Sequence, residues 1–111
     1  MIEQTIYNYM AETLVDPCYM MRPENAPERY VLLEKTGGSE DNHIKRSTFA
    51  FQSYAPTLFE AAELNETVKG VVPELVALDE ITGVRYTTDY NFTNTATKQP
   101  RYQAVFDVYH Y

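Results

Sequence analysis

Apolar residues recur at every second position in the last stretch of the chain, Arg101–Tyr111, which is typical of a half-buried strand. Because successive side chains of a strand point to opposite faces, this alternation sorts them into two sets. One face carries Tyr102, Ala104, Phe106 and Val108, and the other carries Gln103, Val105, Asp107 and Tyr109. A polar stretch, Asp89–Pro100, precedes it and predicts a long loop. We therefore expect the first set to lie in the core and the strand to serve a sheet or a neighbouring subunit.

Four earlier stretches also predict strands: Cys18–Met21, Arg29–Thr36, His43–Tyr54 and Ile81–Thr88. Arg29–Thr36 is apolar on both faces in its middle, which predicts a central strand. The glycine-containing segment Gly37–Asn42 predicts the loop of a hairpin with His43–Tyr54. In the last of the four, Gly83 indicates a bulge.

Two amphipathic stretches predict helices, at residues 2–14 and Pro56–Val72. Apolar side chains recur in both at spacings of three and four. Thr57 and Glu60 form a capping-box pattern at the start of the second helix, and Pro73 is expected to end it. Leu75–Leu78 predicts a short helical turn. The expected inner stripes are Ile2, Ile6, Tyr9, Met10, Thr13 and Leu14 in the first helix, and Leu58, Ala61, Ala62, Asn65, Val68 and Val72 in the second.

This order of elements predicts an α+β fold with a mostly antiparallel sheet of about four to five strands and two helices packed on one face. The chain has 111 residues, which is enough for one modest core, so residues 1–111 are expected to form a single domain.

The formal charge of −7 argues against a protein that grips nucleic-acid phosphates, because that task needs clustered Lys and Arg. The only adjacent basic pair is Lys45-Arg46. A single cysteine, Cys18, excludes an internal disulfide. The first residues lack the basic start of a signal peptide, and no apolar run approaches the roughly 20 residues that span a bilayer.

Catalytic and metal-binding patterns are absent from the sequence. His43 and His110 have no metal-ligand spacing, and both are predicted to lie on the surface. Cys18 is expected to be a small buried hydrophobe. Gly37-Gly38-Ser39 lacks the phosphate-loop pattern. We therefore expect no catalytic residue, no metal and no cofactor.

Three stretches carry a family resemblance: LEKTGGSEDNHI (Leu33–Ile44), FAFQSYAPTLFEAAELNETVKG (Phe49–Gly70) and DYNFTNTATKQPRYQAVFDVYHY (Asp89–Tyr111). In these the chain resembles the tail-terminator, or tail-completion, proteins of tailed bacteriophages and prophages. The resemblance implies a non-enzymatic α+β subunit that forms a homo-oligomeric ring, commonly a hexamer. Such a ring caps the tail tube protein and docks to the head–tail connector protein, while DNA passes through it without specific binding. The implied location is the virion tail, with assembly in the cytoplasm of the bacterial host.

Two other functions remain open beside the ring-forming subunit. One is a small-ligand-binding or enzymatic α+β domain with a pocket between helix and sheet, and the other is an adaptor domain that forms no ring.

The residues that make contacts in the assembly are predicted from loop position alone. The candidate assembly-interface residues are Thr36, Gly37, Gly38, Ser39, Glu40, Asp41 and Asn42 in the first loop, and Tyr90, Asn91, Phe92, Thr93, Asn94, Thr95, Thr97, Lys98 and Gln99 in the second.

Overall fold

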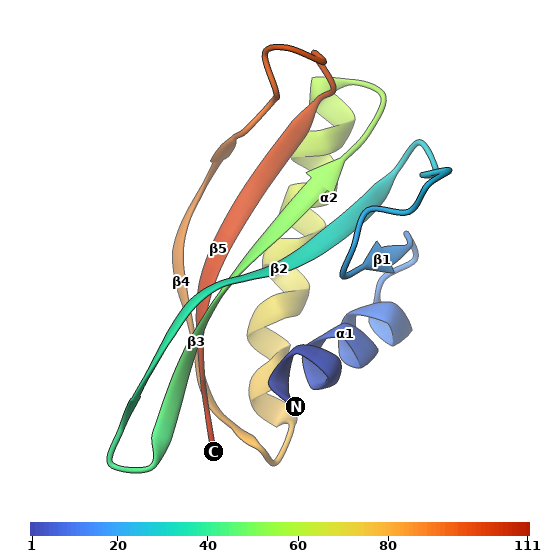
Figure 1. Cartoon of the computed structure of the whole chain (residues 1–111). Helices are drawn as coiled ribbons and strands as arrows, with labels where there is room; N and C mark the ends of the chain where they lie inside the picture. Colours follow the sequence, from blue (N-terminus) through green and yellow to red (C-terminus); the bar gives the residue numbers. More distant parts are fainter.

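A five-stranded sheet with two helices on one of its faces makes up the protein (Figure 1). The structure is a computed structural model that describes all residues from Met1 to Tyr111. The strand order is β1-β2-β3-β5-β4; only β1 and β2 pair in parallel. This confirms the predicted α+β class. The elements are α1 (Ile2–Thr13), β1 (Cys18–Tyr19), β2 (Tyr30–Asp41), β3 (Ile44–Tyr54), α2 (Leu58–Val71), the 3-10 helix η1 (Val72–Ala77), β4 (Ile81–Asn91) and β5 (Arg101–His110).

The core fills the space between the helices and the sheet. Its centre is a set of phenylalanines, in which the rings of Phe51 and Phe106 meet edge to face at 5.8 Å. The predicted inner face of β5 is confirmed, since Ala104 and Val108 are buried beside them. Cys18 is also part of this core, and burial raises the pKa of its thiol to about 11. The thiol is therefore held neutral and serves as an apolar group, as predicted.

Both helices form where expected, but their inner stripes differ from the prediction. In α1, Thr13 was expected on the inner stripe and is exposed. The stripe of α2 differs more. Leu58 is exposed, whereas Leu64, which was not expected there, is buried. The rotation of a helix about its axis follows the side that packs on the sheet, and in α2 this side runs through Ala61, Leu64 and Val68. The Thr57 hydroxyl caps α2 by accepting from the Glu60 amide at 3.2 Å, which confirms half of the capping box.

The predicted loop Thr36–Asn42 is wrong. β2 continues to Asp41, and the turn consists of Asn42 and His43, with φ of 50° and 68°. Two successive positive φ values are typical of a type I′ turn, which matches the twist of the flanking strands. The glycines of β2 have no positive φ, so they do not form a turn. A bulge between Lys35 and Gly37 absorbs the irregularity instead.

At the other end of the sheet, β4 continues three residues beyond its predicted end. Tyr90 and Asn91, expected in a loop, pair with Gln103 and Tyr102 of β5. The connecting loop is therefore shorter, from residue 92 to residue 100. The bulge predicted at Gly83 is confirmed by a register shift in β4, and a second shift follows between Tyr86 and Thr88.

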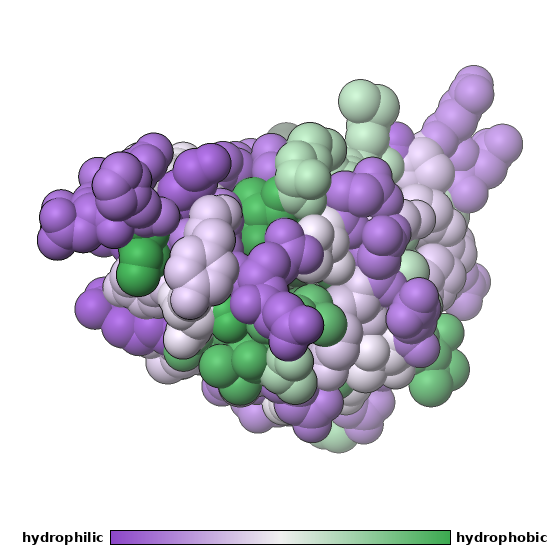
Figure 2. Space-filling view, turned by 90° about the horizontal axis from the view of Figure 1, so that it is seen from below, coloured by the Kyte–Doolittle hydropathy of each residue, from purple (hydrophilic) through white to green (hydrophobic).

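The prediction that β2 is central holds for only a small part of its length. β1 pairs with it at Val31 and Leu32 alone, and the remainder of that edge has no neighbouring strand. From Glu34 to Asp41 every side chain of β2 is exposed. This half of the β2–β3 hairpin projects beyond the helices (Figure 1), and hydrophilic residues make up most of its surface (Figure 2).

Candidate functional site

The two predicted interface segments lie at opposite ends of the sheet. The hairpin turn lies next to the pair Lys45–His110, at the end of β5. The β4–β5 loop lies next to the pair Tyr54–Arg101, at the start of β5. The molecule is 43 Å long and 25 Å wide in both other directions. Figure 1 shows the hairpin turn and the β4–β5 loop at the two extremes of the long axis. The segments therefore form two separate candidate surfaces.

Side chains within the β4–β5 loop hold it in a defined shape. The Asn94 carboxamide oxygen accepts from the amides of Ala96 and Thr97, at 2.8 and 3.3 Å. The Arg101 guanidinium lies 4.3 Å from the centre of the Phe92 ring, and its Nε donates to the Phe92 carbonyl at 2.8 Å. The loop is thus anchored at the strand end, while the side chains of Asn94, Thr95, Thr97 and Lys98 remain exposed.

The sheet face opposite the helices carries a connected ladder of hydrogen bonds near this loop. Gln52 donates to Gln103 at 2.9 Å, and Gln103 donates to the Tyr90 hydroxyl at 2.6 Å. Tyr54 donates to Gln52 at 3.0 Å and accepts from Arg101 at 2.9 Å. The alternation placed Gln52 and Gln103 away from the core, but only the β3–β5 register shows that they are opposite each other.

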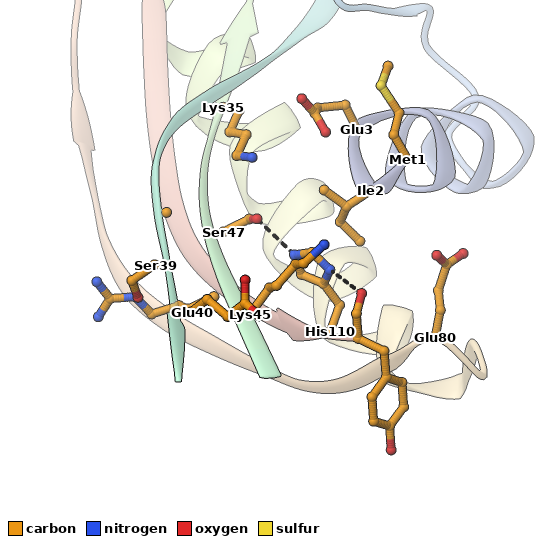
Figure 3. Close-up of a pocket in the computed structure, with 13 residues that line it drawn as sticks. Met1, Ile2, Glu3, Lys35, Ser39, Glu40, Lys45, Ser47, Glu80 and His110 are labelled. Atoms are coloured by element: carbon orange, nitrogen blue, oxygen red, sulfur yellow. Dashed lines mark hydrogen bonds between the residues drawn. The ribbon is translucent and has the colours of Figure 1, made fainter. Parts of the chain in front are cut away.

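A groove of about 670 Å³ lies where the hairpin overhangs the start of α1 (Figure 3). Its charged lining is mixed, with three basic side chains, Lys35, Lys45 and Arg46, and three acidic ones, Glu3, Glu40 and Glu80. The mixture of signs gives the groove no strong preference for an anion or a cation.

The prediction that His110 lies on the surface is wrong, because only 5% of it is exposed. It follows Val108 on the inward face of β5, and it pairs with Ile81 of β4. Ser47 Oγ lies 2.8 Å from His110 Nε2, and the Tyr111 carbonyl lies 3.2 Å from Nδ1. Since a carbonyl can only accept, Nδ1 donates to Tyr111, and in that tautomer Nε2 accepts a hydrogen bond from the Ser47 hydroxyl. His43, by contrast, is exposed at the turn, as predicted.

The negative charge is concentrated in the helical part of the molecule. Residues 2–13 and 58–80 contain eight acidic side chains and one lysine, whereas the remainder contains eight acidic and eight basic side chains. The single lysine, Lys69, pairs with Glu66 at 3.3 Å and Asp89 at 3.2 Å. The helical layer thus holds the whole formal charge of −7. Sequence composition revealed the total but not this division between layers.

Asp89 connects the helical layer to the outer strand. It accepts hydrogen bonds from Asn65 at 2.8 Å, from Lys69 and from the Tyr86 hydroxyl. Burial by itself raises the pKa of this carboxyl, but the three donors outweigh burial and the pKa is lowered. The ionised carboxylate is therefore part of the native structure.

Comparison with known proteins adds no assignment: no protein-family model and no curated protein matches the sequence. None of the helices combines the length and the apolar composition that a membrane-spanning helix requires. No group of three or more His, Cys, Asp or Glu side chains converges as a metal site.

Proposed function

We propose that this protein is a non-enzymatic structural protein of the phage head–tail joining region. In this proposal it forms a ring, commonly of six copies, that caps the tail tube and docks to the head connector. The observation that carries the proposal is the two-ended shape: a rigid sheet presents one exposed polar segment at each end. A ring between a tube and a connector needs two distinct docking surfaces of this kind.

Ring formation requires contacts in which one patch of a copy meets a different patch of the next copy. The two long edges of the sheet supply such a pair, because β2 and β4 differ in sequence and in bulge position. The anchored ladder of Gln52, Tyr54 and Gln103 keeps the sheet face near the loop rigid, which limits the entropy lost on assembly.

The charge division supports one orientation of the copies. If the helical layer faces the central opening, its net charge of −7 repels DNA phosphates and lets DNA slide through without specific binding. Acidic side chains that line no opening in the assembled ring would contradict this part of the proposal.

Light scattering combined with negative-stain imaging tests the proposal. The purified chain is measured over a range of concentrations, alone and with tail tube. We expect closed rings that cap tube ends and stop their growth. A chain that stays monomeric under both conditions would show that it is not a terminator.

A second candidate function is an acyl-transfer enzyme in the groove, favoured by the Ser47–His110 pair. In such an enzyme the Ser47 oxygen would attack a carbonyl carbon while its proton passes to His110 Nε2, and the proton would then pass to the leaving group. The test is labelling by a fluorophosphonate, with Ser47→Ala as the control. Labelling of the native chain that the variant loses would establish this candidate; its absence would leave the pair as a buried hydrogen bond.

A further inference from the structure

We propose that the free edge of β2 pairs antiparallel with β4 of the next copy, joining the sheets of neighbouring copies. This inference deepens the proposed function and rests on it, since it names the surface by which one copy recognises another.

Both strands have a free edge. β1 covers β2 only at Val31 and Leu32, so the stretch from Leu33 to Asp41 has no neighbour on that side. β4, from Ile81 to Asn91, is the last strand of the sheet at the opposite side. A free edge presents unpaired N–H and C=O groups, which are a template for another strand.

The strand directions fit a head-to-tail arrangement. Each of the pairs β2–β3, β3–β5 and β5–β4 is antiparallel, so β2 and β4 run in opposite directions. A copy added beside β2 with its helices on the same face therefore presents β4 in the antiparallel sense. Because the two patches differ, the contact repeats from copy to copy, and it closes into a ring when the rotation between copies allows.

The bulges select a register. β2 bulges between Lys35 and Gly37, and β4 bulges between Tyr86 and Thr88. Placing Lys35 opposite Asp89 of the next copy brings the two bulges side by side. Residues opposite each other then point to the same face of the joined sheet, both before and after the bulges.

In that register Lys35 and Asp89 both lie on the helix side, because they pair with the core residues Phe49 and Ala104. So do Gly38 and Tyr86, whereas Ser39 and Arg85 share the open face.

The side chains brought together by this register are complementary. Lys35 has no ion-pair partner in its own chain. It would add a further donor to Asp89 of the next copy, which already accepts from Asn65, Lys69 and Tyr86. Tyr86, 49% exposed, would lie over Gly38, which lines the groove and has no side chain. An aromatic ring over a strand glycine covers otherwise bare backbone. Asp41 would lie diagonally from Arg85, a second pair of opposite charge.

Disulfide cross-linking of Ser39→Cys and Arg85→Cys in one chain tests the register. Residues opposite each other in an antiparallel pair have Cα atoms about 4.5–5.5 Å apart, within the disulfide range of about 4.4–6.8 Å. Both side chains are exposed, and that of Arg85 is 67% exposed, so the variant should fold. Cys18 remains in place, because it is buried and its thiol pKa is about 11. Mild oxidation should give a ladder of covalent oligomers that ends at the ring.

Two controls separate this register from other contacts. A mixture of the two single variants should stop at covalent dimers, since each chain then has one cysteine at the interface. Combining Ser39→Cys with Val84→Cys, whose side chain points to the other face, should give little cross-linking.

The contrary outcomes are distinct. Rings visible by imaging without cross-links in the double variant would overturn the edge pairing and leave the proposed function standing. Dimers formed by Arg85→Cys alone would show that β4 pairs with β4 and would also overturn it. A chain that is monomeric with and without tail tube would overturn both proposals.

Discussion

The two halves of the β2–β3 hairpin share the same strands but have opposite surroundings. In the covered half, Tyr30–Leu33 pairs with Phe51–Tyr54, and most of these side chains are buried. In the projecting half, Glu34–Asp41 and Ile44–Arg46 are exposed, although every residue from Gly37 onward has a paired partner. Ordering the backbone costs about 1–2 kcal/mol per residue, and a hydrogen bond returns a net of about 1 kcal/mol. The projecting half therefore adds little to the stability of the core, which favours a role in contacts with another chain.

The largest expected effect lies in the covered half. Phe51→Ala removes a ring that packs on Phe49 and Phe106, so it should lower the free energy of unfolding by about 3–5 kcal/mol. Ile44→Ala, in the projecting half of the same strand, should cost less than about 1 kcal/mol. Urea unfolding of the two variants measures both values. Equal losses would remove the distinction between the halves.

A smaller effect is expected where the helical layer meets β4. Asp89→Asn removes the charge that accepts from Lys69 and Tyr86, and should destabilise by about 1–3 kcal/mol at neutral pH. Because the folded pKa is lowered from its usual 3.8, the carboxylate contributes stability above that pH and loses it as the pH falls through the folded pKa.

The difference between native and variant should therefore shrink below about pH 3.8. Chemical unfolding at several pH values measures this difference. A gap that stays constant down to pH 2 would show that the charge of Asp89 is not the cause.

The start of α2 should show a loss of about 1 kcal/mol. Thr57→Ala removes the hydroxyl that accepts from the Glu60 amide. Thr67→Ala, in the same helix, removes only a hydroxyl that donates to the Glu63 carbonyl within the turn, and should change stability by less than about 0.5 kcal/mol. Thermal unfolding compares the two, and a ranking in the other order would contradict the capping role.

The smallest effect on stability, with the largest on assembly, is expected in the projecting half. Lys35→Glu should change the free energy of unfolding by less than about 0.5 kcal/mol, because the side chain is exposed and unpaired. It should nevertheless reduce ring formation, since it would face Asp89 of the next copy. Lys98→Glu, at the far end of the molecule, is the matched control and should leave ring formation unchanged. Sedimentation measures both, and equal effects on assembly would point to net charge as the cause.

The covered part of the fold was predictable from sequence, and the projecting part was not. Period-two alternation placed Phe106 and Val108 inside correctly, because one buried face constrains every second residue. In Thr36–Asn42 no buried face exists, so the glycines suggested a turn where a bulged strand occurs. The inward position of His110 also escaped prediction, because the partners that bury it are distant in sequence: Ser47 by hydrogen bonding and Ile81 by pairing. The proposed contact between the edges of β2 and β4 depends on the order of strands in the sheet, which the pattern of apolar residues within each strand does not encode.

Removal of the outer part of the projecting half tests whether this half of the hairpin serves assembly and not folding. Replacing Ser39–Arg46 with Asn-Gly would join Gly38 to Ser47 by a two-residue hairpin turn and keep their pairing. Light scattering and urea unfolding would then be measured on the native and shortened chains. The account predicts that the shortened chain loses no more than about 1 kcal/mol of stability and stays monomeric where the native chain forms rings. A shortened chain that still assembles into rings, or that no longer folds, would contradict it.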